Sequence, residues 1–189
     1  AAALLAAAGA VVHGKMSRPG LRALVIGSPR GSSALVTGPD GRHRLFDAGA
    51  DCSALRDTFR ALGIRRVEEL RLTGPGRDLR RCARRLPEFV AVGKVVEPEG
   101  GRGGPAGQGV ELRHHEVALR WEESGIVVSR GEKVEFCILT APHSAFSQRC
   151  PYDRSYSTRR LGAVWVSSDG ENVTIDSQRE RHAHGRPFS

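Results

Sequence analysis

Apolar and polar residues alternate in short runs along most of this chain, which is the period-2 pattern of half-buried β-strands. Turn residues separate the runs. The clearest turn is Pro39-Asp40-Gly41, since Pro presets one turn dihedral and Gly accepts positive φ. The predicted strands cover residues 21–26, 33–37, 44–47, 69–73, 89–96, 110–112, 117–121, 126–129, 134–139, 163–166 and 173–176.

One stretch with a helical period predicts the first helix, at residues 51–62. Leu55 and Phe59 are spaced to lie on one helical face. Asp51 or Ser53 can cap the amino end, and a glycine directly after the segment can stop it.

A second helix is predicted at residues 78–86, directly after the strand at 69–73 and a turn that contains two glycines. Its apolar residues recur at i, i+3, i+4 and i+7, so that one face can pack while the basic residues lie elsewhere. Pro87 ends the helix. The apolar positions are Leu79, Cys82, Ala83 and Leu86, and the basic positions are Arg77, Arg80, Arg81, Arg84 and Arg85.

The 189 residues suffice for one domain with a core of its own. The formal net charge is +8, with 29 Lys and Arg residues. Such a balance favours polyanionic partners such as nucleic acid or anionic lipid. A GC-rich coding sequence also raises the content of Arg, Ala and Gly without any partner, so the charge alone leaves both explanations open.

The four cysteines have none of the close spacings of a zinc ribbon or a redox motif. Cys82 falls on the apolar face of the second predicted helix, and Cys137 falls inside an apolar strand. We therefore expect buried free thiols that act as small hydrophobic side chains, rather than structural disulfides.

The first residues, AAALLAAAGAVV at 1–12, are apolar apart from glycine but fewer than the about 20 needed to cross a bilayer. Since the chain begins with Ala and not Met, we interpret this run as the end of a transmembrane helix. A secretory signal is the alternative, although no basic segment precedes the run. The chain then divides into residues 1–20 (membrane-helix end and polar connector), a domain at 21–178 and a polar tail at 179–189.

The strand at 69–73, its glycine turn and the helix that opens with Asp78 resemble the ligand motif of metallo-β-lactamase-fold hydrolases. In that family the motif reads Thr-His-x-His-x-Asp-His. Here Thr73 and Asp78 match the Thr and the Asp, Gly74 and Gly76 stand where the first two His belong, and Leu79 replaces the last His. The frame of the motif is present without its imidazoles.

The order of the other segments resembles the C-terminal domain of ComEC-type competence proteins, which are inner-membrane channels for DNA uptake. Those proteins carry Leu-Asp-Val-Gly-Gln-Gly-Asp-Ala, then Pro-Asp-Gly-Arg and Leu-Ile-Asp-Gly-Gly. The matching segments here are residues 24–27, 39–42 and 45–49. Further on, residues 141–147 resemble the family's Ala-Pro-His-His-Gly-Ser run, and residues 156–170 resemble its closing hairpin.

This resemblance implies an α/β fold, namely a metallo-β-lactamase-like αββα sandwich with mixed sheets, here truncated. It implies a place at the inner (cell) membrane through an upstream channel, with DNA as the partner and no small-molecule substrate. The side of the membrane stays open. Basic residues after the apolar run suggest the cytoplasmic side, whereas the resemblance implies the outer side, where DNA arrives.

The chain lacks most of the metal ligands of that family. Val25 replaces the Asp of the first strand, and only Asp78 and His143 remain at ligand positions. A catalytic zinc site needs about three protein ligands and an open position. We therefore expect no cofactor, although active relatives use zinc or manganese, and no catalytic residues. The expected role is that of a non-catalytic domain that is structural or contacts the DNA backbone.

The alternative is a metal-dependent hydrolase or nuclease with rearranged ligands, so that the question of enzyme activity stays open. Its ligands would be Asp47, Asp78, His143 and Asp153. Local structure explains two of them more simply, because Asp78 can cap the helix that it opens and Asp47 can cap its turn. Ser144 is adjacent to His143, but no nucleophile elbow surrounds it.

The remaining histidines give weaker signals. His114 and His115 are adjacent, so the two faces of a strand would keep them apart. His182 and His184 lie in the polar tail, where metal binding is a weak signal.

The arginines of the second predicted helix are the candidates for contact with DNA. Guanidinium groups on one helix can contact phosphates without reading sequence. No aromatic residue interleaves with them, so stacking on bases is not expected. The alternative is a solvated helix face with ion pairs to Glu68, Glu69 or Glu88.

Overall fold

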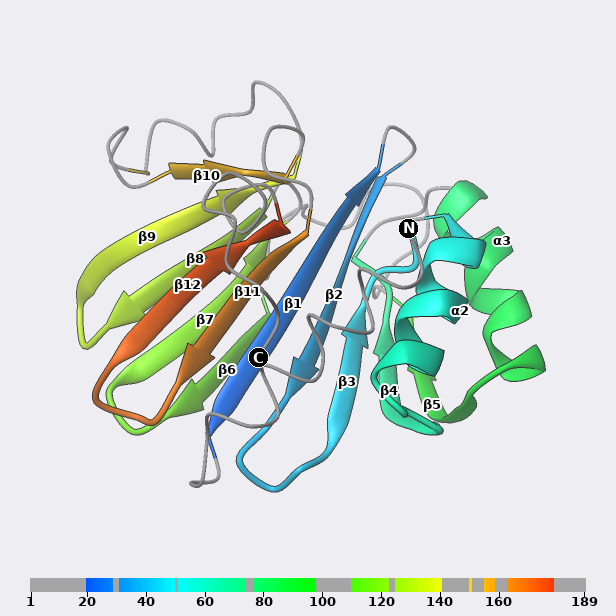
Figure 1. Cartoon of the computed structure of the whole chain (residues 1–189), viewed down its shortest axis with the longest axis horizontal. Helices are drawn as coiled ribbons and strands as arrows, with labels where there is room; N and C mark the ends of the chain where they lie inside the picture. Colours follow the sequence, from blue (N-terminus) through cyan, green and yellow to red (C-terminus); the bar gives the residue numbers. More distant parts are fainter. Residues whose placement is uncertain are drawn as a thin grey trace.

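The computed structural model of the chain (Figure 1) describes residues 20–28, 31–49, 51–73, 77–97, 110–122, 125–140, 150, 155–158 and 163–178. These residues are mostly β, with 56% in strands and 18% in helices, and they contain two α-helices. Two mixed sheets carry the strands.

The first sheet has seven strands, and both α-helices follow strands that it contains. Its elements are β1 (Leu21–Ser28), β2 (Gly31–Thr37), β3 (His43–Phe46), α2 (Cys52–Ala61), β4 (Arg66–Arg71), α3 (Arg77–Arg85), a 3-10 turn (Leu86–Glu88), β5 (Ala91–Val96), β11 (Val164–Ser168) and β12 (Val173–Ser177). The strand order is β12-β11-β1-β2-β3-β4-β5. β3, β4 and β5 run parallel, which requires the crossovers that α2 and α3 supply.

The second sheet has five strands, in the order β10-β9-β8-β7-β6. Its members are β6 (Val110–His114), β7 (Val117–Glu122), β8 (Gly125–Arg130), β9 (Lys133–Leu139) and β10 (Ser155–Ser157). β6 to β9 form an antiparallel meander, and β10 pairs parallel to β9.

The alternation along β1 and β2 builds two apolar layers, one on each face of the seven-stranded sheet. Leu21, Ala23 and Val25 lie in the core between the sheets, together with Trp121 of β7. Leu24 belongs instead to the core that Leu55, Phe59, Cys82 and Leu86 build beneath the helices. Figure 1 shows α2 and α3 on the side of this sheet that faces away from the five-stranded sheet.

The predicted αββα sandwich is wrong. In the described residues helices cover only the seven-stranded sheet. The outer face of the five-stranded sheet carries a small apolar cluster of Val127, Cys137 and Cys150. The physical reason is local: residues 110–139 form four strands joined by short turns, which leaves no length for a helix between them.

Most predicted strands are present, within a few residues at each end. Of the two predicted N-cap candidates, Asp51 is the N-cap of α2, and its side chain accepts from the backbone N–H of Ser53. β4 begins at Arg66, earlier than predicted, and the predicted strand at 89–96 begins only at Ala91. The predicted membrane-helix end, the glycine-rich segment at 100–109 and the polar tail lie outside the described residues. None of the described helices is long and apolar enough to cross a membrane.

The prediction of free thiols is also wrong, because the four cysteines form two disulfides. Cys52 at the start of α2 bonds to Cys82 in α3, and Cys137 of β9 bonds to Cys150. The partners are 30 and 13 residues apart in the chain, so their spacing did not reveal them. Cys82 is buried, as expected of its helix face.

Candidate functional site

One buried carboxylate joins the two sheets at the ends of β3 and β4. Asp47 directly follows β3 and has a left-handed φ of 55°. Its Oδ1 accepts from the Thr73 N–H at 2.7 Å, and its Oδ2 accepts from the Thr73 hydroxyl at 2.5 Å and from the Trp121 indole N–H at 3.2 Å. The carboxylate therefore connects β3 to the segment after β4 and, through Trp121, to the other sheet.

The surroundings of Asp47 act on its pKa in opposite directions. The side chain is 5% exposed, and burial raises the pKa of Asp47, although the hydrogen bonds from Thr73 and Trp121 act to lower it. Burial disfavours the charged form, whereas donors favour it. The group is consequently held by three donors and still protonates more readily than an exposed aspartate.

Asp47 was predicted to cap its own turn, but its side chain makes long-range hydrogen bonds. Their donors, Thr73 and Trp121, lie 26 and 74 residues further along the chain. Its fit to a metal site is poor. Both oxygens already accept hydrogen bonds from fixed donors, so a cation would have to displace them. The geometry gives Asp47 a structural role.

The second feature is the arginine surface of α3, defined here as Arg80, Arg81, Arg84 and Arg85. Arg81, Arg84 and Arg85 are exposed, and Arg80 is partly buried. The predicted separation of faces is present, because Cys82 and Leu86 are buried beneath the helix. Arg81, Arg84 and Arg85 are therefore presented to solvent from a helix whose underside is fixed, whereas the Nε atom of Arg80 is buried.

Exposed glutamates pair with the first and the last arginine of this surface. Arg80 Nη2 lies 3.2 Å from Glu97 Oε2, and Arg85 Nε lies 3.4 Å from Glu88 Oε2. Both glutamates are exposed, at 57% and 60% of their side chains. Exposed ion pairs of this kind contribute little, about 0–1 kcal/mol, so the guanidinium groups can exchange partners readily.

Two other glutamates that the sequence suggests as partners of this helix pair elsewhere. Glu69 is held by Arg71 at 2.7 Å and Lys94 at 2.9 Å. Burial acts to raise the pKa of Glu69, but the hydrogen bonds from Lys94 and Arg71 outweigh it and lower that pKa. Glu68 is engaged by Arg66.

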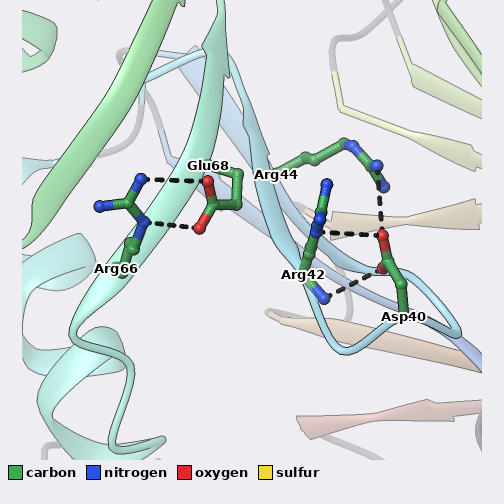
Figure 2. Close-up of polar contacts among 5 residues, drawn as sticks. All are labelled: Asp40, Arg42, Arg44, Arg66 and Glu68. Carbon is green, nitrogen blue, oxygen red and sulfur yellow. Dashed lines mark hydrogen bonds and ion pairs between the residues drawn. The ribbon is translucent and has the colours of Figure 1, made fainter.

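The strand ends and the β2–β3 turn carry a contrasting basic cluster. Figure 2 shows that Arg66 points at Glu68, while Arg42 and Arg44 both point at Asp40. The hydrogen bond from Arg66 lowers the pKa of the exposed Glu68. Each of these three arginines is matched by a carboxylate in its own neighbourhood.

Several predicted site residues cannot be placed. α3 begins at Arg77, one residue earlier than predicted, so Arg77 and Asp78 both lie in its first turn. The side chains of these two residues fall outside the described part of the structure. His143, Ser144 and Asp153 lie outside them as well. Only Asp47 of the alternative ligand set is therefore located, and no described group of three or more His, Cys, Asp or Glu residues could share a metal ion.

The prediction that His114 and His115 are kept apart is wrong. The imidazoles of His114 and His115 were predicted to point to opposite faces of a strand, yet their ring centroids lie 4.5 Å apart. The reason is the backbone of His115, whose φ of 53° is left-handed. His is one of the residue types that are enriched at positive φ, but this weak signal does not by itself identify the position.

Comparison of the chain with models of protein families, with curated protein sequences and with solved structures finds no match.

Proposed function

We propose that this protein is a non-catalytic domain of a ComEC-like membrane channel for DNA uptake, and that it contacts the DNA backbone through α3. The observation that carries the DNA contact is the arginine surface of α3. The link to an uptake channel rests on the sequence resemblance alone, because the αββα fold that this resemblance implies is not found in the described residues.

The arrangement of α3 suits contact with phosphates. Guanidinium groups present several donors in a planar fork that matches phosphate oxygens. Arg84 and Arg85 close the helix, so their charges lie at the end that favours cations. Contacts of this kind fix a protein on DNA without reading its sequence.

The attachment of α3 keeps these charges in place. The disulfide between Cys52 and Cys82 ties its middle to the start of α2, and Leu86 is fully buried beneath its end. A surface held in this way loses less side-chain and backbone freedom on binding than a flexible segment does.

The disulfides also bear on the compartment. Structural disulfides persist in oxidising surroundings such as the periplasm or the cell exterior, and they are rare in the cytosol. Two of them in one domain favour the outer side of the inner membrane. That is the side on which incoming DNA would be met.

Binding to duplex DNA tests the role of α3. The variant with Arg80, Arg81, Arg84 and Arg85 all changed to Gln should bind two unrelated duplex sequences much more weakly than the parent at low salt, and equally weakly for both. The matched control changes Arg42, Arg65, Arg66 and Arg113 to Gln. Both variants lose four of the eight net positive charges, but the control charges lie on β-strands, turns and loops.

The proposal requires the two variants to differ. If the control variant loses as much affinity as the α3 variant, net charge and not this helix determines binding. If the α3 variant binds as tightly as the parent, the helix is a solvated face and the proposed function is wrong.

The compartment is tested by mass spectrometry of protein alkylated during extraction from its native membrane fraction. We expect no alkylated cysteine until the protein is denatured and reduced, and four thereafter, since the chain has four cysteines. Alkylation of all four without reductant would place the domain in a reducing compartment.

A further inference from the structure

Two imidazole rings meet at one end of the sandwich, in the turn between β6 and β7. His114 ends β6, and His115 follows with a φ of 53°. This left-handed conformation is uncommon for residues other than glycine. It brings the two rings to a centroid distance of 4.5 Å with their planes at 51°.

A glycine from the other sheet lies against both rings. Gly170 is in the turn between β11 and β12, and a Cβ atom there would lie 2.4 Å from Cδ2 of His115 and 3.4 Å from Cε1 of His114. The same β11–β12 turn is also held by Arg130 at the end of β8, whose Nη1 donates a hydrogen bond to the carbonyl oxygen of Glu171 at 3.1 Å. Figure 1 shows the β6–β7, β8–β9 and β11–β12 turns at the same end of the molecule.

One nitrogen of this pair has no partner. His114 Nδ1 is buried and makes no hydrogen bond in the described part of the chain, although buried polar atoms are normally paired. The ring beside it belongs to His115, which is exposed. An exposed side chain can turn, so the buried nitrogen can be reached without disturbing the core.

An acidic residue of the neighbouring β11–β12 turn, Asp169, is already occupied. Asp169 Oδ1 accepts from the backbone N–H groups of Glu171 at 3.0 Å and Asn172 at 2.7 Å. These two hydrogen bonds lower the pKa of the exposed Asp169 to about 2. The two imidazoles, rather than Asp169, are therefore the groups that this end of the sandwich offers to a ligand.

We propose that His114 and His115 bind one transition-metal dication of the kind that prefers imidazole, such as Zn²⁺, with water completing its coordination. Imidazole nitrogens suit zinc, copper and nickel, whereas calcium and magnesium require oxygen ligands. Two imidazoles that ligate one zinc at about 2.0–2.1 Å hold their ring centres about 5 Å apart, which is near the 4.5 Å observed. The site is independent of α3 and of DNA contact.

Zinc titration followed by imidazole proton–nitrogen correlation NMR tests this site directly, because one spectrum reports every histidine of the protein separately. His182 and His184 are first changed to Gln, so that the tail does not compete. Zn²⁺ should then shift the ring nitrogens of His114 and His115 together, with saturation at one equivalent. His43 is the internal control, since its Nδ1 lies 2.9 Å from the Thr37 hydroxyl, and it should not move.

The matched variant is His115→Gln, at an exposed position where the fold should persist, as the amide spectrum will show. Losing one of two ligands should weaken zinc binding by at least the roughly tenfold that loss of a residue supporting a metal ligand costs, and it should abolish the shift of His114. His114→Gln should do the same to His115. The proposal is overturned if zinc shifts other histidines while His114 and His115 stay unchanged, or if His115→Gln binds zinc as tightly as the parent.

Discussion

Asp47 and the arginine surface of α3 are both charged, but their surroundings are opposite. Asp47 is 5% exposed and receives three hydrogen bonds from residues distant in the chain. Arg80 and Arg85 of the α3 surface pair with glutamates that are more than half exposed. A buried charge depends on every one of its fixed donors, whereas an exposed ion pair can be exchanged at little cost in free energy. Asp47 should therefore determine stability, and α3 should determine binding.

The two regions meet through the packing beneath α3. Leu70 of β4 and Leu86 after α3 belong to the same core, and Asp47 fixes the segment that follows β4. The helix can present charge to solvent because its other side is held by apolar contacts and a disulfide. The predictions below separate these contributions, and they run from the largest expected effect to the smallest.

Loss of the Cys52–Cys82 bridge should have the largest effect on stability. Changing both residues to Ala opens a loop of 30 residues and should lower the free energy of unfolding by about 3.5 kcal/mol, measured by urea denaturation. Native-state hydrogen exchange should show lost protection in α3. The control variant changes Cys137 and Cys150 to Ala. It should lower the free energy of unfolding by about 3 kcal/mol without a selective loss of hydrogen-exchange protection in α3. An unchanged unfolding midpoint for the first variant would show that the bridge does not hold the helix.

Asp47→Ala should destabilise the fold by about 3 kcal/mol, because it leaves three donors without their acceptor. The comparison is Asp40→Ala in the β2–β3 turn, whose side chain is 43% exposed and whose loss should change stability by less than about 1 kcal/mol. Both are measured by urea denaturation. Equal effects of the two substitutions would contradict the distinction between buried and exposed carboxylates.

The pH dependence of stability should carry a smaller signature of Asp47. Burial raises its folded pKa above the unfolded value of about 3.9, so the folded state holds this proton more tightly than the unfolded chain does. Its contribution to stability therefore falls as pH rises from about 4 through the raised folded pKa. Asp47→Asn removes this dependence.

The measurement is the difference in unfolding free energy between Asp47→Asn and the parent across that range. We expect the difference to shift in favour of the variant as the pH increases, whatever constant penalty the new amide brings. A difference that is flat, or that shifts towards the parent, would show that the pKa of Asp47 is not raised by folding.

The smallest effect on stability is expected from the surface of α3. The variant with Arg80, Arg81, Arg84 and Arg85 changed to Gln loses the ion pairs of Arg80 and Arg85 with exposed glutamates, and such exposed pairs contribute little, so its free energy of unfolding should change by less than about 1 kcal/mol. Thermal and urea unfolding of this variant check the value. A loss comparable to that of Asp47→Ala would mean that these arginines stabilise the fold rather than serve a partner.

The alternation of residues predicts most of the sheet, because burial on one or both faces leaves a direct mark on the sequence. β1, β2 and the meander of β6 to β9 are found this way. β10, Ser155–Ser157, carries no such mark, since its three residues are half-buried and are placed by pairing with β9. Periodicity shows which face is apolar but not what covers it, so the expected outer helices came from resemblance and are absent from the described fold.

Long-range contacts were the hardest part of the site to predict. Asp47 looks like a turn residue, and only the folded chain brings Thr73 and Trp121 to it. The disulfide partners and the imidazole pair likewise depend on the approach of distant segments or on a single backbone angle. The two faces of α3, by contrast, depend only on local helical spacing, and the described residues Cys82 and Leu86 lie buried as predicted.

The salt dependence of DNA binding tests the central claim most directly. Each phosphate neutralised on duplex DNA contributes about 0.9 to the slope of log K against log salt concentration. The quadruple Arg80, Arg81, Arg84 and Arg85 to Gln variant should therefore have a slope shallower than that of the parent by up to about 3.6, while the Arg42, Arg65, Arg66 and Arg113 control keeps the parental slope. Identical slopes for the parent and the α3 variant would contradict the account, because the helix would then make no phosphate contacts.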